Sequence, residues 1–368
     1  MKRIVCLVGM ICLLNSCEKD KRLPFLIWLA ELEVMDNEIL PFNFELSKSA
    51  SGKYQMEIYN ASEVIHVDEI EISNDSIIIK TPVFEGYIAG TFTDKSIKGQ
   101  FIKESLDRIV PFEAVYGEAD RFKINNSSIE NISGVWEAEF EPNTDDTYIA
   151  KGIFTQRDDK VTGTFRTTTG DYRYLEGVVT GDSLKLSAFD GAPFLFTAKV
   201  TDSSLNGAFY SGNHSKELFV AKRNDAYELP SADSLTFIKE GYDKFAFSFP
   251  NELGESISLE DERFKNKVVI VQIMGTWCPN CLDESKYYID YLKKNSSSEV
   301  EIVALAFEYA KTKEGAFKSI KRMKDRIGVE YPILLAQFGS SDKEKAQQKL
   351  PMLNHVLSYL YSLTKKEM

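Results

Sequence analysis

Cysteine is missing from most of this 368-residue chain. Three of the five cysteines lie within the first 17 residues, and the other two are Cys278 and Cys281. A disulfide-stabilised scaffold is therefore excluded, because the whole stretch between Cys17 and Cys278 contains no thiol. Basic residues are also outnumbered: 44 Lys and Arg stand against 56 Asp and Glu, for a net charge of −12. Nucleic-acid partners are not expected, because their recognition needs a basic face.

The length of the chain allows two to three domains. Hydrophobic residues make up 43% of the sequence and charged residues 27%, which are ordinary values for globular proteins. Each domain can therefore bury a core of its own.

The N-terminus has the pattern of a secretory signal. Lys2 and Arg3 precede the apolar run Ile4–Leu14, which is too short to span a bilayer because a spanning helix needs about 20 residues. The run ends in Leu14-Asn15-Ser16-Cys17, which resembles the lipobox of bacterial lipoproteins. That resemblance implies removal of a signal peptide over 1–16 and acylation of Cys17. The alternative is an uncleaved apolar stub with an incidental cysteine.

Cleavage would leave Cys278 and Cys281 as the two free thiols of the mature chain. Several acyl chains bury many methylenes, each contributing about 0.8 kcal/mol, so the anchor to the bilayer would be durable. The segment Glu18-Lys19-Asp20 resembles the charged export tags of Gram-negative surface lipoproteins. We expect a lipid-anchored protein of the Gram-negative cell envelope, on the periplasmic side.

The region from about residue 40 to residue 223 has the pattern of β-strands. Apolar and polar residues alternate in segments such as Phe42–Leu46, Gln55–Tyr59 and Trp136–Phe140, with Gly, Asn and Asp turns between them. Such segments predict antiparallel sheets with one solvated face. We expect the aromatic residues at strand spacing to form cores.

An internal repeat divides this region in two. Thr93–Phe101 and Thr201–Phe209 share the pattern Thr-Asp-x-Ser-apolar-x-Gly-x-Phe. The repeat predicts two similar β-rich units, over 40–120 and 132–223, each a small barrel or sandwich of hairpins. An anchor-proximal segment, 17–39, would precede them.

The pattern changes after a polar linker over 224–246. Lys267–Met274 is an apolar, β-branched run that is typical of a central parallel strand buried on both faces. A helical stretch over Cys281–Lys294 follows, then a strand-like run at Val300–Phe307 and a basic amphipathic helix at Thr312–Ile327. Strands that alternate with helices predict an α/β layer.

The chemistry of the chain is concentrated at Trp277-Cys278-Pro279-Asn280-Cys281. Cys278 would lie at the N-terminus of a helix, where unpaired N–H groups and the helix dipole stabilise a thiolate and make it a nucleophile. Cys281 is one turn further on and could resolve a mixed disulfide with a substrate. We expect Cys278 to be the more exposed of the two sulfurs.

Two other interpretations of the cysteine pair are a structural disulfide and half of a zinc site. Zinc needs further Cys or His ligands, and this part of the chain adds only His355. A structural disulfide rarely spans so small a loop behind an aromatic residue. The Pro and Thr pattern of peroxiredoxins is missing, so a peroxidase is disfavoured. We expect no cofactor and no metal.

From about Phe247 onward the sequence resembles the membrane-anchored, thioredoxin-like thiol–disulfide oxidoreductases of the TlpA and ResA type. The matching pieces are the apolar strand, Gly-Thr-Trp-Cys-Pro-Asn-Cys at 275–281, and an acid three positions past the second cysteine. The resemblance implies that Cys278 is the nucleophile, Cys281 the resolving cysteine and Trp277 a shielding aromatic. Three further neighbours of the site would be Pro279, Asn280 and Glu284. The last of these is the weakest match and could instead cap the helix. The implied partners are client protein disulfides and an upstream thiol donor.

The C-terminal end departs from this family. A thioredoxin fold needs a cis-proline loop facing the cysteines, followed by a hairpin and a helix. Leu360 stands where similar proteins have that proline, and Pro351, the alternative, precedes a helix-like stretch. The sequence therefore predicts a truncated domain over 247–368, with an apolar strand edge and with reduced activity and stability.

The sequence thus predicts a multidomain protein: two β-rich barrel-like or sandwich-like units followed by an incomplete α/β thioredoxin-like domain. The leading hypothesis for its function is a lipid-anchored thiol–disulfide oxidoreductase of the envelope, acting as a reductase. The rival hypothesis is a non-catalytic lipoprotein whose β-units bind a partner or a glycan.

Overall fold

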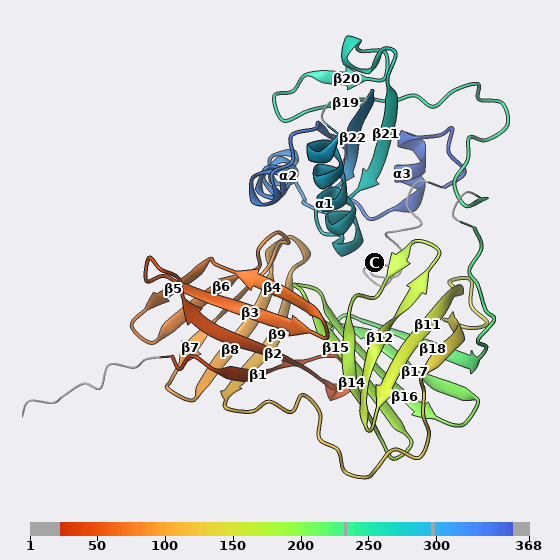
Figure 1. Ribbon diagram of the computed structural model, residues 1–368. Coiled ribbons are helices and arrows are strands. Elements are labelled where there is room, and N and C mark those ends of the chain that lie inside the picture. Colours follow the sequence, from red (N-terminus) through yellow and green to blue (C-terminus); the bar gives the residue numbers. More distant parts are fainter. Residues whose placement is uncertain (1–22, 232–233, 296–298, 356–368) are drawn as a thin grey trace, which may run out of the picture.

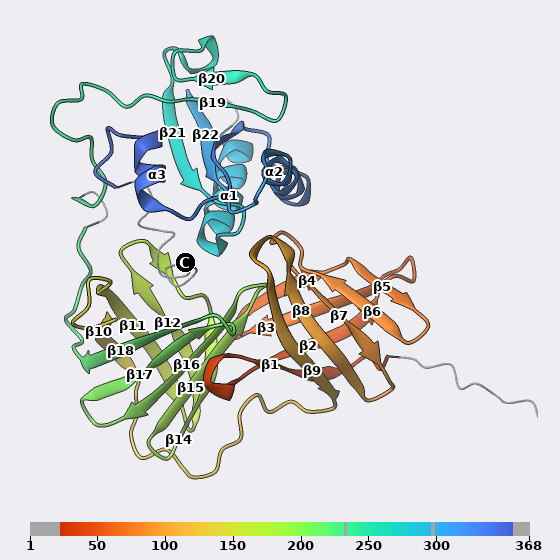
Figure 2. The ribbon, with the colours of Figure 1, turned by 180° about the vertical axis from the view of Figure 1, so that it is seen from behind.

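The computed structural model describes residues 23–231, 234–295 and 299–355 (Figure 1). The expected signal peptide, Cys17 and Leu360 lie outside the described residues. Two β-rich units lie side by side, and a C-terminal α/β domain lies across one end of both (Figures 1 and 2). Of the helices in the described part of the chain, none is long and apolar enough to cross a membrane.

The first β-unit is a strongly curved sheet of nine antiparallel strands. Its order is β4-β3-β2-β1-β9-β8-β7-β6-β5, so that each strand pairs with neighbours in sequence except where β1 meets β9. The strands are β1 (Ile27–Glu33), β2 (Ile39–Lys48), β3 (Tyr54–Asn60), β4 (Glu63–Val67), β5 (Ile70–Ser73), β6 (Ser76–Lys80), β7 (Tyr87–Phe92), β8 (Ser96–Lys103) and β9 (Arg108–Tyr116). Two 3₁₀ turns accompany them, η1 (Met35–Asn37) and η2 (Glu104–Leu106).

The predicted start of this unit at residue 40 was too late. Strand β1 lies in the middle of the sheet, between β2 and β9, so much of the supposed anchor-proximal segment is part of the β-unit. Trp28, Ala30 and Leu32 alternate inward and are fully buried. A single alternating run of seven residues does not show which strands are its neighbours, and only its pairing with β2 and β9 shows where it belongs.

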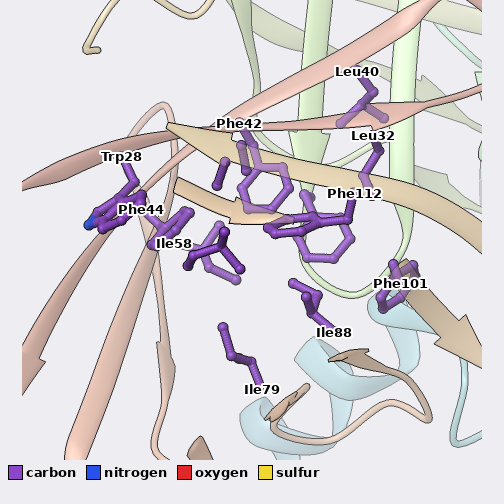
Figure 3. Packing of buried hydrophobic residues seen from close by; sticks show 14 of the residues in the cluster. Trp28, Leu32, Leu40, Phe42, Phe44, Ile58, Ile79, Ile88, Phe101 and Phe112 are labelled. Atoms are coloured by element: carbon purple, nitrogen blue, oxygen red, sulfur yellow. The ribbon is translucent and has the colours of Figure 1, made fainter. Parts of the chain in front are cut away.

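The two β-units share part of their cores. Figure 3 shows the cluster inside the first unit, where the rings of Trp28 and Phe44 stack with centroids 5.8 Å apart. Phe42 in the same cluster stacks at 4.4 Å on Phe189, which belongs to the second unit. Each such buried ring stabilises the fold by about 1.5–3 kcal/mol. The aromatic residues expected in cores are therefore found there, and the two units pack against one another.

The second β-unit is a closed barrel. Its sheet runs β11-β10-β18-β17-β16-β15-β14-β12-β13, and β11 also pairs with β12, which closes the ring. The strands are β10 (Gly134–Phe140), β11 (Tyr148–Arg157), β12 (Lys160–Thr167), β13 (Gly170–Asp171), β14 (Leu175–Thr180), β15 (Ser183–Phe189), β16 (Pro193–Val200), β17 (Ser204–Ser211) and β18 (Ser215–Arg223). The prediction of two barrel-like β-units is confirmed.

The sequence repeat corresponds to the same hairpin in both units. In each copy the Thr and Ser hydroxyls of the Thr-Asp-x-Ser turn hydrogen-bond, at 3.0 Å in the first copy and 2.8 Å in the second. The repeated glycines, Gly99 and Gly207, lie where the neighbouring strand comes too close for a side chain. A Cβ atom there would lie 2.1 Å from the carbonyl oxygen of Ala89 and 2.0 Å from that of Thr197, respectively.

The C-terminal domain is a three-layer α/β structure. Its parallel sheet has the order β21-β22-β23, with α1 and α2 on one face and α3 on the other. The elements are β19 (Ser248–Pro250), β20 (Ser256–Ser258), η4 (Glu262–Phe264), β21 (Val268–Met274), α1 (Pro279–Lys294), β22 (Val300–Phe307), α2 (Lys313–Ile327), β23 (Ile333–Gln337) and α3 (Lys343–Lys349). The predicted α/β layer is confirmed.

The prediction that the strand leading to the cysteines is the central one is wrong. In the described part of the sheet β21 pairs with β22 alone, and β22 is the central strand, between β21 and β23. Val268 at the start of β21 is 64% exposed. An apolar run is compatible with an edge strand as well as with a central strand, so the composition of the run did not separate the two. The alternative cis-proline, Pro351, follows a trans peptide bond.

Candidate active site

The cysteine pair lies at the turn between β21 and α1. The strand ends at Met274, and the chain reverses through Gly275 so that the indole of Trp277 folds back beneath it. A Cβ atom on Gly275 would lie 2.3 Å from the indole nitrogen, so only glycine fits there. That nitrogen donates to the carbonyl oxygen of Phe307 at 3.1 Å, and the indole stacks on Tyr309 at 4.2 Å. Trp277 is thereby fixed against β22 and the residues that follow it.

Cys278 caps the N-terminus of α1. Its backbone is extended, and its Sγ accepts a hydrogen bond from the backbone N–H of Cys281 at 3.3 Å. Pro279 occupies the first helical position, where its missing N–H costs nothing because that donor would be unpaired. A backbone N–H of the first helical turn, which has no partner within the helix, therefore points at the sulfur of Cys278.

Cys281 lies inside the first turn of α1 and is buried. A hydrogen bond with the Cys278 side chain, together with burial, raises the pKa of the Cys281 thiol well above its ordinary value. Both cysteines are free thiols. The geometry therefore gives the two sulfurs different chemistry: Cys278 receives a donor, and Cys281 is held protonated near neutral pH.

The expected difference in exposure between the two cysteines is wrong. Cys278 is 4% exposed and Cys281 is 3% exposed. Phe84 of the first β-unit packs into the same core cluster as Cys278, and the hairpin of β12 and β13, from the second β-unit, lies across a pocket from it. Nothing in the local sequence around the motif could reveal this cover.

A narrow polar pocket separates the hairpin from the motif. The hairpin side contributes Thr167, Thr169, Gly170, Asp171 and Tyr172, together with Phe194 of β16, and the motif side contributes Trp277, Cys278, Pro279 and Asn280. Asn280 donates from Nδ2 to the carbonyl oxygen of Asp171 at 3.2 Å. Four of the six predicted site residues thus line one pocket, and residues from another unit form its opposite wall.

Glu284 does not cap the helix start. It accepts hydrogen bonds from Gln272 on β21 at 3.0 Å and from the hydroxyl of Tyr288 at 2.7 Å. The same Gln272 amide donates to the carbonyl oxygen of Cys281 at 3.1 Å, and its Oε1 accepts from Ser285. Gln272 is 2% exposed and was missed by the sequence analysis, although a single polar residue inside an apolar run is a signal for such a hub.

Glu308 is a second residue that sequence analysis missed. It follows β22, is 2% exposed, and accepts from the backbone N–H of Thr276 at 2.8 Å and from the Thr276 hydroxyl at 2.7 Å. Burial raises the pKa of Glu308 to about 7, although the hydrogen bonds from Thr276 act in the opposite direction. This carboxyl group holds the turn two residues ahead of Cys278.

Comparisons with known proteins concern the domain that contains this site. The model of the AhpC/TSA family matches residues 242–347. "Thiol-disulfide oxidoreductase ResA" of Bacillus subtilis (strain 168) is 32% identical over 98 residues, which are 27% of this chain and 50% of that protein. The C-terminal domain is a TlpA/ResA-type thioredoxin-like domain.

This chain spans about half the length of the curated relative that it matches, and the matched segment is about a quarter of this chain. A solved thiol-disulfide oxidoreductase from Bacteroides fragilis NCTC 9343 is 21% identical, with 28% of this chain and 71% of that chain covered and a TM-score of 0.23. A protein of unknown function from the DUF3598 family of Nostoc punctiforme PCC 73102 is 11% identical, with 54% and 96% covered and a TM-score of 0.18. These two likenesses are too remote to extend to function. The thioredoxin-like domain alone carries the redox assignment.

Proposed function

We propose that this protein exchanges disulfides with client proteins of the cell envelope through the pair Cys278 and Cys281, and that it acts as a reductase. The observation that carries the proposal is the hydrogen bond from the Cys281 N–H to the Cys278 Sγ. It places a thiolate-stabilising donor on one sulfur while the other sulfur is buried and held protonated.

The reaction has two steps. The Cys278 thiolate attacks a client disulfide, so that an S–S bond forms between Cys278 and the client while the client's own S–S bond breaks and its other sulfur leaves as a thiolate. Cys281 then loses its proton and attacks the Cys278 sulfur, which closes the Cys278–Cys281 disulfide and releases the second client thiol. Two electrons pass to the client. A dithiol donor returns the pair to the reduced state by the same exchange in reverse.

The proposal also places the protein in the envelope of a Gram-negative bacterium, held to the bilayer by lipid on Cys17 and facing the periplasm. The support for this is the N-terminal sequence: a basic end, a short apolar run and the lipobox-like Leu-Asn-Ser-Cys. An oxidising compartment also contains the disulfide-bonded proteins that such a pair would act on.

A trapping experiment tests the function. In Cys281→Ser the resolving step is lost, so client proteins should accumulate as mixed disulfides on Cys278 and appear on non-reducing gels of cell envelopes. Cys278→Ser is the matched control and should trap nothing, since the nucleophile is gone. Cys281→Ser that captures no client in the native envelope would contradict the proposal and favour the rival binding function.

A further inference from the structure

The β12–β13 hairpin lies on the face of the thioredoxin-like domain where a client disulfide has to arrive. In Figures 1 and 2 the hairpin rises from the second β-unit toward the end of α1 that carries the cysteines. Its strands pair through Thr167 with Gly170, and Asp171 accepts the hydrogen bond from Asn280. In-line attack requires a client sulfur within about 3–3.5 Å of the nucleophile. Cys278 is 4% exposed, and the hairpin forms the opposite wall of the narrow pocket that Cys278 lines.

A cluster of ion pairs is centred on Arg173, two residues after the end of the hairpin in the sequence. The guanidinium of Arg173 is 6% exposed and pairs with carboxylates from all three units. Glu63 comes from β4 of the first unit, Asp190 from the loop after β15 of the second unit, at 3.1 Å, and Asp283 from α1 of the thioredoxin-like domain. Arginine suits this role because its planar fork presents several donors in fixed directions. One side chain, directly after the β12–β13 hairpin, is thus joined to the helix that carries the cysteines.

A second set of contacts holds the first β-unit to α2. Arg322 binds Glu69 through both terminal nitrogens, at 2.8 and 3.3 Å, and also donates to the carbonyl oxygen of Thr81 at 2.7 Å. Arg326 pairs with Asp68 at 2.5 Å. Apolar residues of the β6–β7 loop, among them Phe84, pack into the same core cluster as Cys278. Docking therefore involves ion pairs on α2 as well as on α1.

We propose that the β12–β13 hairpin is a built-in gate that occupies the client site, and that Arg173 is its latch. This rests on the proposed exchange reaction and states its regulation: a client disulfide reaches Cys278 only after the β-units undock. The charged pairs among these contacts suit reversible docking, because an ion pair that is solvated again on opening costs little, whereas Phe84 and its apolar neighbours oppose opening.

The test measures access to Cys278 in the full-length protein. Cys281→Ser serves as the background, and two thiol reagents are compared: iodoacetamide, which is small, and a maleimide carrying a polyethylene glycol chain. Mass spectrometry of the Cys278 peptide gives each rate. The ratio of the two rates reports steric access, because a change in the reactivity of the sulfur itself affects both reagents.

Two substitutions weaken docking at separate places. Asp283→Ala removes the carboxylate of α1 from the latch, and Glu69→Ala removes the partner of Arg322 on the other side. Each should raise the large-to-small rate ratio about fivefold, since Asp283→Ala takes one carboxylate from the buried guanidinium of Arg173 and Glu69→Ala takes the two-point partner of Arg322. The matched controls are Asp290→Ala, an exposed acid on the same helix, and Glu71→Ala, whose partner Lys80 lies in its own unit. Both controls should leave the ratio unchanged.

Circular dichroism and thermal melting establish that each variant is folded before its rates are compared. An unchanged or lower ratio in folded Asp283→Ala and Glu69→Ala would overturn the gate, and so would a wild-type ratio equal to that of a freely exposed thiol. The redox function is read separately, from equilibration of the unsubstituted cysteine pair with a glutathione buffer. If the cysteine pair equilibrates with glutathione but the docking variants leave access to Cys278 unchanged, the gate alone is refuted. If the pair never forms its disulfide, the proposed function is refuted.

Discussion

The backbone N–H of Cys281 donates to the Sγ of Cys278 at 3.3 Å, across the first turn of α1. The donor belongs to one cysteine and the acceptor to the other, and the hydrogen bond with Cys278 together with burial raises the pKa of the Cys281 thiol. Pro279 between them starts the helix and fixes this geometry. The division of labour within the pair is therefore built into the helix start.

Cys281 should react slowly as long as the protein is folded. In the variant Cys278→Ala, burial still disfavours the Cys281 thiolate, so iodoacetamide at pH 8 should label Cys281 at least about tenfold more slowly than in urea-unfolded protein. Quantitative mass spectrometry of the labelled peptide measures both rates. Equal rates in the folded and unfolded protein would show that Cys281 is neither buried nor held protonated.

Glu308 should make stability depend on pH. Because burial raises its pKa from 4.5 to about 7, the folded protein binds more protons than the unfolded protein between these values. Stability contributed by this group is therefore lost as the pH rises from about 4.5 to about 7 and is constant above that, with a total of at most about 3 kcal/mol.

The substitution Glu308→Gln keeps an acceptor for the Thr276 N–H and removes the titration. Urea unfolding of the two proteins from pH 4.5 to pH 8 should show a smaller decline in the variant, and the variant should be the more stable of the two above pH 7. Parallel stability curves would contradict the assignment of this pKa to Glu308.

The repeated glycines should be intolerant of any side chain. In Gly99→Ala and Gly207→Ala the new methyl group meets a carbonyl oxygen of the adjacent strand, so each variant should lose about 2–4 kcal/mol of stability. Urea unfolding measures the loss. The neighbouring exposed positions supply controls, and Gln100→Ala and Asn206→Ala should change stability by less than about 0.5 kcal/mol. Comparable effects at glycine and control positions would refute the close approach of the strands.

Gln272 should hold the start of α1 against β21. Gln272→Leu leaves the carbonyl oxygen of Cys281 and the hydroxyls of Ser285 and Tyr331 without this partner, so we expect a loss of about 2–4 kcal/mol. The reduction potential of the cysteine pair should move as well, since the helix turn that carries Cys281 is no longer held. Equilibration with a glutathione buffer measures the potential, and guanidinium unfolding measures the stability. An unchanged potential in the folded variant would confine Gln272 to a structural role.

Much of the α/β domain could be predicted from local patterns. The strand at Val300–Phe307, the helix after Thr312 and the turn at the cysteines follow from apolar periodicity and capping residues, which act over a few residues. The place of β21 in its sheet could not be predicted, because pairing depends on strands that are distant in sequence. The same limit applies to β1, whose neighbours β2 and β9 become apparent only in the folded sheet.

By itself the sequence determined the chemistry: two cysteines in a strand-to-helix turn, preceded by a tryptophan, and a duplicated β-unit with one hairpin in common. Local backbone geometry and a short repeat are sufficient for both. The tertiary structure alone decided what surrounds that chemistry, because Arg173 and its three carboxylates Glu63, Asp190 and Asp283 come from three units and meet only in the folded chain. Charge clusters assembled from distant segments leave no spacing in the sequence that could reveal them.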